Sequence, residues 1–253
     1  MNIAVVTGAS SGLGREFAHL LDTDGLDEIW VTARRADRLA ALQDSLQTPV
    51  RVFAGDISQA VTTAAIQRAL EEQAPRVRYL ICSAGFGKIG TSDSISLAAA
   101  QKMIEVNCTA AVTMTYLCLP FMTSGSRIAE ICSVAAFQPI PNLNVYAATK
   151  AFLYHYSRAL AEELREKNIT VTAVCPYWIK DTEFITIAQQ APSGSGFRRF
   201  PLADTQTFVA RKAWKDICKG KSVSTPGAVA AADRLFAKLV PAGVMMWLSR
   251  MMR

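Results

Sequence analysis

The chain has 253 residues, of which 51% are hydrophobic and 19% charged, and its formal net charge is +6. This composition supplies a large apolar core, and Pro and Gly are too few for a disordered or fibrous chain. Lys and Arg are scattered along the sequence, which argues against nucleic-acid binding, whereas a basic bias suits a polyanionic cofactor.

The six cysteines form no C-x-x-C pair, and the chain has only two histidines. The cysteines are therefore predicted to be free thiols in a reducing compartment, and no metal site is expected. The sequence opens directly with a strand pattern and contains no window of 18 or more apolar residues. We therefore expect a cytoplasmic protein without a secretory signal or a membrane-spanning helix.

Short apolar runs alternate with amphipathic stretches as far as residue 176. Strands that are covered by helices on both faces read as continuous apolar runs, so the alternation predicts an α/β fold with a doubly wound parallel sheet. We expect about seven strands within a single domain over residues 1–253. Strands are predicted at residues 2–6, 28–32, 50–54, 79–82, 127–132, 170–175 and near 221–225, and helices at 13–23, 36–47, 58–74, 97–123, 145–167 and 205–218.

The pattern changes after Pro176. Residues 177–225 contain a polar, glycine-containing stretch at 191–197, on the side of the sheet where ligands bind in such folds. A long loop in a compact domain is usually functional, so residues 177–225 are predicted to form a substrate lid.

Residues 226–253 read as an apolar helical extension that is broken at 241–243. Its methionine-rich end, 244–253, could lie on a membrane interface, pack on a partner subunit or pack across the active site. We favour packing over membrane contact because the segment is short.

The first strand runs into a turn, Thr7 to Gly14, with the spacing G-x-x-x-G-x-G, and then into a helix. The glycines allow a tight turn and a close approach of the backbone to a ligand. The helix N-terminus offers unpaired N–H groups and the positive end of the helix dipole, which suits a pyrophosphate. The predicted cofactor-binding residues of this turn are Gly8, Ser10, Ser11, Gly12, Leu13 and Gly14.

The second strand ends in Ala33-Arg34-Arg35, without the acidic residue that an NAD site places on the ribose 2′-hydroxyl. An arginine there suits a 2′-phosphate, because a guanidinium can bind phosphate oxygens bidentately. We therefore predict NADP(H) in preference to NAD(H), with Arg34 as the main ligand and Arg35 or Arg38 in support.

Two further turns follow the third and fourth predicted strands. The side chain of Asp56 is predicted to reach the adenine amino group, and Ile57 to lie against the adenine ring. The small residues Ser83, Ala84 and Gly85 leave room for the adenosine ribose.

Tyr146 and Lys150 are four residues apart and so lie on one face of a predicted helix. A lysine ammonium beside a phenol favours the phenolate and is expected to lower the tyrosine pKa. The pair can therefore exchange a proton with a carbonyl or an alcohol.

These motifs, with Ser133 thirteen residues before Tyr146, resemble the short-chain dehydrogenase/reductase family over roughly residues 1–182. The resemblance implies a Rossmann-type sheet, a nicotinamide-dependent oxidoreductase, and a homodimer or homotetramer. The catalytic set that it implies is Asn107, Ser133, Tyr146 and Lys150.

The implied reaction is reversible hydride transfer between the nicotinamide and a ketone, aldehyde or alcohol. Tyr146 would act as general acid in reduction, and Ser133 would donate a hydrogen bond to the substrate oxygen. Lys150 would lower the tyrosine pKa and bind the nicotinamide ribose, and Asn107 would hold a water that connects Lys150 to solvent. Near the nicotinamide we expect Pro176, Ile179 and Thr182.

The sequence departs from the family pattern at two turns. The usual Asn-Ala-Gly is Ser83-Ala84-Gly85 here, so the link that the asparagine makes with the central sheet is expected to weaken. The usual Pro-Gly is Pro176-Tyr177, and this tyrosine is expected to narrow the nicotinamide site.

The predicted substrate contacts are apolar and aromatic and favour a hydrophobic carbonyl or a hydroxysteroid-like compound. Two alternatives are a membrane-surface reductase of a lipid-linked carbonyl, held by residues 244–253, and a non-catalytic dinucleotide-binding sensor of the same fold. The substrate contacts are predicted to be Ser133, Ala135, Tyr146, Tyr177 and Trp178.

Overall fold

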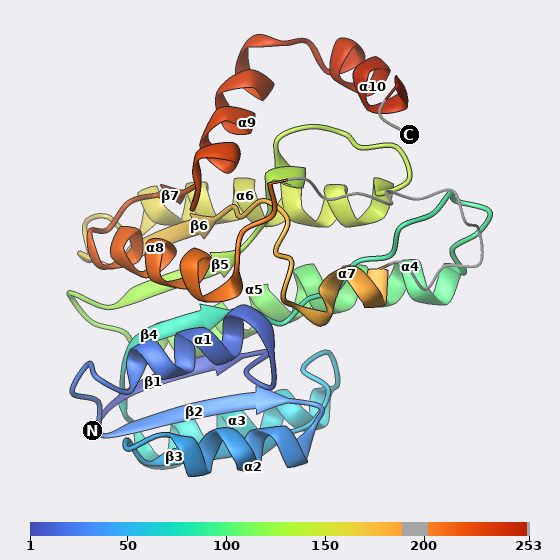
Figure 1. Ribbon diagram of the computed structural model, residues 1–253. Helices are drawn as coiled ribbons and strands as arrows, with labels where there is room; N and C mark the ends of the chain where they lie inside the picture. The colour runs from blue at the N-terminus through green and yellow to red at the C-terminus, as the bar shows by residue number, and fades with distance from the viewer. Residues whose placement is uncertain (189–201, 252–253) are drawn as a thin grey trace.

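The computed structural model describes residues 1–188 and 202–251. Within these residues, seven parallel strands form one sheet in the order β3-β2-β1-β4-β5-β6-β7, with helices on both faces (Figure 1). The predicted α/β fold with a doubly wound parallel sheet is confirmed. The strands are β1 (Asn2–Thr7), β2 (Glu28–Ala33), β3 (Val50–Ala54), β4 (Arg76–Cys82), β5 (Arg127–Ile131), β6 (Thr170–Val174) and β7 (Val223–Ser224).

Strand β4 is longer than the apolar pattern predicts. It begins at Arg76 and not at Tyr79, because its first residues pair with the start of β1, Arg76 opposite Asn2 and Val77 opposite Ile3. Arginines at the strand's solvent end interrupt the apolar run without interrupting the backbone pairing, so the sequence pattern alone shortens the strand.

Two apolar layers enclose the sheet. On one face, Phe17 and Leu21 of α1 pack in the same cluster as Val209 of α8. On the other face, Leu70 of α3 and Met114 of α5 belong to a second cluster. The helices of the first layer are α1 (Gly12–Leu21), α2 (Ala36–Ser45) and α8 (Gln206–Cys218), and those of the second are α3 (Ala60–Gln73), α5 (Ala110–Cys118) and α6 (Asn144–Glu163).

The helix predicted at 97–123 is one continuous run made of α4 (Leu97–Ile104), a π-helical turn (Glu105–Thr109), α5 and a 3₁₀ turn (Leu119–Phe121). By length and a mean hydropathy of 1.2, this run is apolar enough to cross a membrane. The sequence predicted no membrane-spanning helix because polar residues interrupt the apolar run, and this stays a prediction, since length and average hydropathy alone are weak evidence for a span. Met114 and Cys118 are fully buried in the core against the sheet, as in the core helix of an α/β fold.

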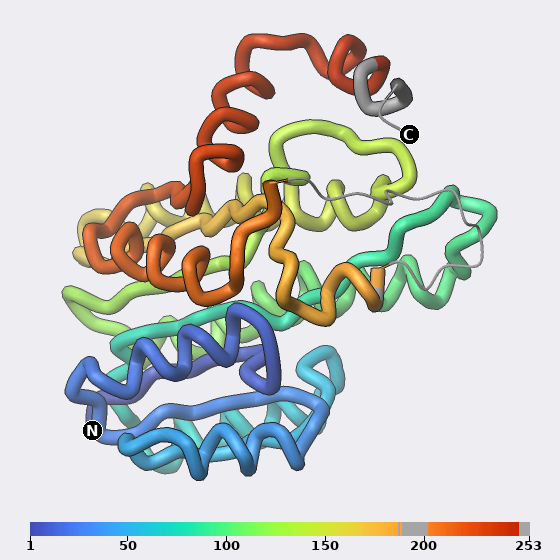
Figure 2. The backbone as a smooth tube through the Cα atoms, in the orientation of Figure 1, coloured from blue at the N-terminus to red at the C-terminus, as the bar shows by residue number. Residues whose placement is uncertain are grey.

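The chain beyond β6 forms α7 (Glu183–Ala188), α8, β7 and then α9 (Ala228–Leu239) and α10 (Ala242–Met251). Of the predicted lid, the polar stretch 191–197 lies outside the described residues. The predicted helical extension is present and is broken where expected, at Pro241. Figure 2 shows α9 and α10 projecting from the sheet, and they expose Leu235, Phe236, Leu239, Val244 and Trp247.

Glu130 is a fully buried acid in β5. The Thr115 hydroxyl lies 3.1 Å from Glu130 Oε1 and 3.0 Å from the Ala111 carbonyl oxygen, to which it can donate its one proton. A protonated Glu130 can then donate to the Thr115 oxygen. Burial raises the pKa of Glu130 from 4.5 to about 8, although hydrogen bonds with Cys82 and Thr115 oppose the shift.

Glu130→Gln should therefore change how stability depends on pH. The folded protein keeps the Glu130 proton up to about pH 8 and the unfolded chain loses it near 4.5, so this group's contribution falls as pH rises between those values. The slope approaches about 1.4 kcal/mol per pH unit. Urea unfolding at pH 5, 6.5 and 8 should show the variant gaining stability relative to the parent protein as pH rises.

The exposed Glu166→Gln is the control and should show no such trend. A stability difference between Glu130→Gln and the parent that is constant from pH 5 to 8 would contradict a neutral Glu130.

Candidate active site

A cavity of about 500 Å3 opens at the carboxyl ends of the central strands, where the strand order reverses between β1 and β4. Ligands bind at this switch point in open α/β sheets. Of the predicted site residues, Gly14, Arg38 and Asn107 do not line the cavity. Those that do are Gly8, Ser10, Ser11, Gly12, Leu13, Arg34, Arg35, Asp56, Ile57, Ser83, Ala84, Gly85, Ser133, Ala135, Tyr146, Lys150, Pro176, Tyr177, Trp178, Ile179 and Thr182.

The glycine turn is packed too tightly for side chains at two positions. Gly8 has a φ of +70°, and a Cβ there would lie 2.8 Å from the Ala84 backbone. A Cβ on Gly14 would lie 2.4 Å from the Gly8 carbonyl oxygen, so Gly14 lies beneath the turn and has a packing role. Ser11, the N-cap of α1, makes no side-chain capping bond, which leaves the first N–H groups of the helix available to an anion.

The ends of β1 and β4 are joined through Thr7. Its hydroxyl oxygen accepts hydrogen bonds from the backbone N–H groups of Ser83 and Ala84, each at 3.0 Å. These two hydrogen bonds use backbone N–H groups and so do not require an asparagine at position 83. Only a contact made by the side chain at this position can be weakened by the serine.

The two adjacent arginines of the predicted phosphate site differ in their contacts. Arg35 donates from Nη2 to the hydroxyls of Ser11 (2.7 Å) and Ser10 (3.2 Å), and its Nη1 lies 2.6 Å from Glu183 Oε2. Arg34 is exposed at the cavity edge and has no hydrogen bond or ion pair with the described part of the chain. Glu183 was not predicted, because nothing in the local pattern of α7 indicates a partner at the start of α2.

Asp56 is already engaged by this chain. Its Oδ1 accepts from the Ser58 backbone N–H at 3.0 Å, and its Oδ2 lies 3.1 Å from the ammonium of Lys102. Lys102, which also lines the cavity, was missed in the sequence. The predicted contact between Asp56 and the adenine amino group would therefore have to be made beside an existing ion pair.

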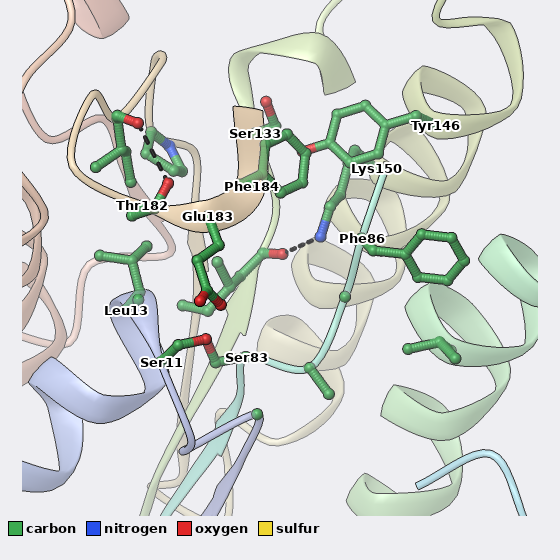
Figure 3. A pocket seen from close by; sticks show the side chains of 18 of the residues that line it. Ser11, Leu13, Ser83, Phe86, Ser133, Tyr146, Lys150, Thr182, Glu183 and Phe184 are labelled. Carbon is green, nitrogen blue, oxygen red and sulfur yellow. Dashed lines mark hydrogen bonds between the residues drawn. The ribbon is translucent and has the colours of Figure 1, made fainter. Parts of the chain in front are cut away.

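Ser133, Tyr146 and Lys150 converge on the cavity from two elements (Figure 3). Ser133 follows the end of β5, whereas Tyr146 and Lys150 lie one turn apart on α6. The nearby Ser133 side chain acts to lower the pKa of Tyr146, against the larger effect of burial. The Lys150 ammonium donates to the Ile131 carbonyl at 2.6 Å and lies 5.8 Å from the centre of the Tyr146 ring.

The predicted lowering of the Tyr146 pKa is wrong. Burial raises the tyrosine pKa above its ordinary value of 10, and it lowers the pKa of Lys150. Tyr146 is only 7% exposed, the ring of Phe184 lies 5.4 Å from its own, and the lysine points to a backbone carbonyl. The Lys150 ammonium, which is directed at the Ile131 carbonyl, does not offset the loss of solvent around the phenol.

Asn107 lies behind the cavity wall in the π-helical turn. Its amide donates to the Phe86 carbonyl (2.9 Å) and the Thr149 hydroxyl (3.0 Å), and its carbonyl oxygen accepts from the Phe86 N–H (3.0 Å). A Cβ on Gly85 would lie 3.1 Å from Asn107 Oδ1 and 3.4 Å from Lys150 Nζ, so both groups face the same glycine. The amide holds the backbone of the β4 turn, and the predicted water relay stays a prediction.

The substrate end of the cavity is apolar. Ala135, Tyr177 and Trp178 lie on its lining as predicted, and Thr182 donates to the Ile179 carbonyl at 3.2 Å. The sequence missed several apolar lining residues because they come from loops and helix ends without a motif. These are Phe86, Val106, Ile140, Leu143 and Phe184.

A family model described as short chain dehydrogenase matches residues 2–192. The chain belongs to this family. It is 34% identical to the sulfoacetaldehyde reductase of Chromohalobacter salexigens over 202 residues, covering 76% of this chain and 79% of the relative. It is 33% identical to the serine 3-dehydrogenase of Agrobacterium fabrum, with 72% and 74% covered. These relatives identify the chain as a member of an oxidoreductase family.

The fold comparison extends the match over the whole chain. The short-chain dehydrogenase from Sphingobium yanoikuyae in complex with NADPH superposes with a TM-score of 0.79 at 26% sequence identity. The match covers 100% of this chain and 97% of that protein, so the described residues after 192, 202–251, also belong to the region that matches this dehydrogenase.

Gly8→Ala should destabilise the protein more than Gly25→Ala. Both glycines have φ near +70°, where an alanine is strained, but a Cβ on Gly25 would meet nothing within 4 Å. The contact with the Ala84 backbone should add about 1–3 kcal/mol of destabilisation in Gly8→Ala. Urea unfolding of both variants measures the difference, and equal losses of stability would show that the turn can relax around a side chain.

Proposed function

We propose that this short-chain dehydrogenase is an NADP(H)-dependent oxidoreductase that interconverts a ketone or aldehyde with an alcohol. The observation that carries the proposal is the convergence of Ser133, Tyr146 and Lys150 on the cavity that the glycine turn and the arginines also line. The groups for proton transfer and those for dinucleotide binding therefore line the same cavity.

The cavity suits a phosphorylated dinucleotide. The uncapped start of α1 offers N–H groups to a pyrophosphate, and Arg34 and Arg35 offer guanidinium groups to a 2′-phosphate. The β2 turn carries no acid for a ribose 2′-hydroxyl. The NADPH complex of the Sphingobium yanoikuyae relative supports the same preference.

The protein's own groups provide the proton chemistry, and the nicotinamide, when bound, supplies or accepts the hydride. In reduction the Tyr146 hydroxyl donates its proton to the substrate oxygen, where Ser133 donates a hydrogen bond. The positive charge of Lys150 favours the phenolate that remains on Tyr146. Asn107 supports this arrangement by holding the Phe86 backbone and the Thr149 hydroxyl in place.

The apolar lining at Phe86, Ile140, Leu143 and Trp178 supports a hydrophobic carbonyl or hydroxysteroid-like substrate. A small polar carbonyl is the second candidate, because the relatives are named for sulfoacetaldehyde and serine. A non-catalytic sensor has less support, since the full set of proton-transfer groups is present.

We further propose a cytoplasmic homodimer or homotetramer. An apolar groove between α4, α5 and α6, lined among others by Ile104, Val112 and Phe152, supports association through this face. The exposed apolar residues of α9 and α10 are proposed to pack within the assembly, with contact to a membrane surface as the alternative.

Tyr146→Phe should lower kcat at least about 100-fold, because the proton donor is removed while the ring is kept. Binding of NADPH should remain close to that of the parent protein. The assay is NADPH oxidation over ketones and aldehydes graded in size and polarity, which also separates the two substrate classes. Tyr116→Phe, on the exposed face of α5, is the control. Unchanged turnover in Tyr146→Phe would refute the assignment.

Arg34→Ala should raise the KM for NADPH about tenfold more than the KM for NADH, since only NADPH carries the 2′-phosphate. Arg15→Ala, in the first turns of α1 but off the cavity lining, is the matched control for loss of one positive charge. Steady-state kinetics with both cofactors measures the effect. Equal increases for the two cofactors would remove Arg34 from the phosphate site.

A further inference from the structure

Residues 182–184 form a short segment that runs across the cavity. Their consecutive side chains contact opposite ends of the site (Figure 3). Thr182 lies above the glycine turn, where a Cβ on Gly12 would be 3.8 Å from the threonine methyl group. Glu183 reaches the arginines that follow β2, and Phe184 lies against Tyr146. Movement of this segment would therefore affect both the phosphate end and the proton-transfer end of the cavity.

Glu183 makes contacts at the phosphate end that a phosphate group would also make. Its Oε2 lies 2.6 Å from Arg35 Nη1 and its Oε1 lies 2.8 Å from Arg38 Nη2. Arg35 donates at the same time to the hydroxyls of Ser10 and Ser11. An anion with two oxygens thus occupies two guanidinium groups at the edge of the cavity.

The ion pairs of Glu183 with Arg35 and Arg38 are weak enough for a phosphate group to displace the carboxylate. Hydrogen bonds from Arg38 and Arg35 lower the pKa of Glu183 to about 2, so the carboxylate is charged at any working pH. The three side chains are 36–42% exposed, and ion pairs at that exposure contribute about 0–1 kcal/mol. A phosphate carries up to two negative charges and three acceptor oxygens, so it should displace a single carboxylate.

At the other end, Phe184 covers the proposed proton donor. Its ring centre lies 5.4 Å from that of Tyr146, and a Cβ on Gly87 would lie 3.0 Å from its outermost carbon. Tyr146 is buried beneath this ring and the β4 turn. A substrate that is to reach the phenol from this side requires Phe184 to move.

We propose that Glu183 competes with the cofactor's phosphate for Arg35 and Arg38 and links phosphate binding to the uncovering of Tyr146. A ligand with a phosphate on its adenosine ribose displaces Glu183 from Arg35 and Arg38, and the adjacent Phe184 withdraws from Tyr146. A ligand without that phosphate leaves both contacts in place. The inference rests on the proposed function, in that NADP(H) binds in this cavity.

The first test is cofactor binding by calorimetry, without turnover. Glu183→Gln keeps the shape of the side chain and removes the competing charge, so it should bind NADPH about fivefold more tightly than the parent protein. Its affinity for NADH should change little. Glu105→Gln is the matched control, since it removes one carboxylate from Lys102 at the same cavity and leaves the arginines untouched.

The second test is hydrogen exchange of the backbone over residues 182–188. In the parent protein, adenosine 2′,5′-bisphosphate should accelerate exchange of this segment, whereas AMP should not. In Glu183→Gln the segment should exchange fast without any ligand. These fragments lack a nicotinamide, so they report the phosphate effect alone.

Three results would overturn the inference while leaving the proposed function intact. They are an NADPH affinity in Glu183→Gln that is unchanged or reduced, an equal gain in Glu105→Gln, and equal exchange with the two fragments. A parent protein that binds no NADPH would overturn the proposed function and this inference together.

Discussion

The site depends on the close approach of two turns, the glycine turn that follows β1 and the turn that follows β4. At Gly8 there is no space for a side chain against Ala84, and the Thr7 hydroxyl binds the same turn through two backbone N–H groups. This contact brings the start of α1 to the point where the strand order reverses. The free N–H groups of the helix, the arginines after β2 and the end of β5 can therefore face one cavity.

Most of the cationic side chains that line the cavity already contact a carboxylate or a carbonyl of the same chain. Arg35 is bound by Glu183, Lys102 by Asp56, and Lys150 by the Ile131 carbonyl. A polyanionic ligand can offer these cations further negative charge beyond that of the protein's own carboxylates and carbonyl. Burial raises the pKa of Tyr146, and the ring of Phe184 contributes to that burial. A lower tyrosine pKa requires a state in which Phe184 has moved and the lysine charge acts on the phenol.

Features that depend on residues close together in the sequence could be predicted, whereas contacts between residues far apart in the sequence could not. The strands and helices of the sheet follow from local periodicity, and the Tyr146–Lys150 pair follows from the geometry of a single helix. Glu183 and Arg35 are 148 positions apart, and only the folded topology brings them together. Asn107 shows a different limit. Its position was predicted, but its amide is engaged by Phe86 and Thr149, and no pattern in the sequence reports how many hydrogen bonds a side chain already makes.

The substrate end of the site is decided by segments outside the central strands. The 3₁₀ turn Val134–Ala136, which carries Ala135 of the lining, contacts α9. Tyr177 lies near Asp233 of the same helix, and burial raises the pKa values of both groups. Helix α9 therefore lies beside residues that line the cavity, although its outer face is exposed. Since the turn after β5 and the residues after β6 line this end of the cavity and lie beside α9, its shape depends on how these three elements pack, whereas Ser133, Tyr146 and Lys150 are positioned by β5 and α6.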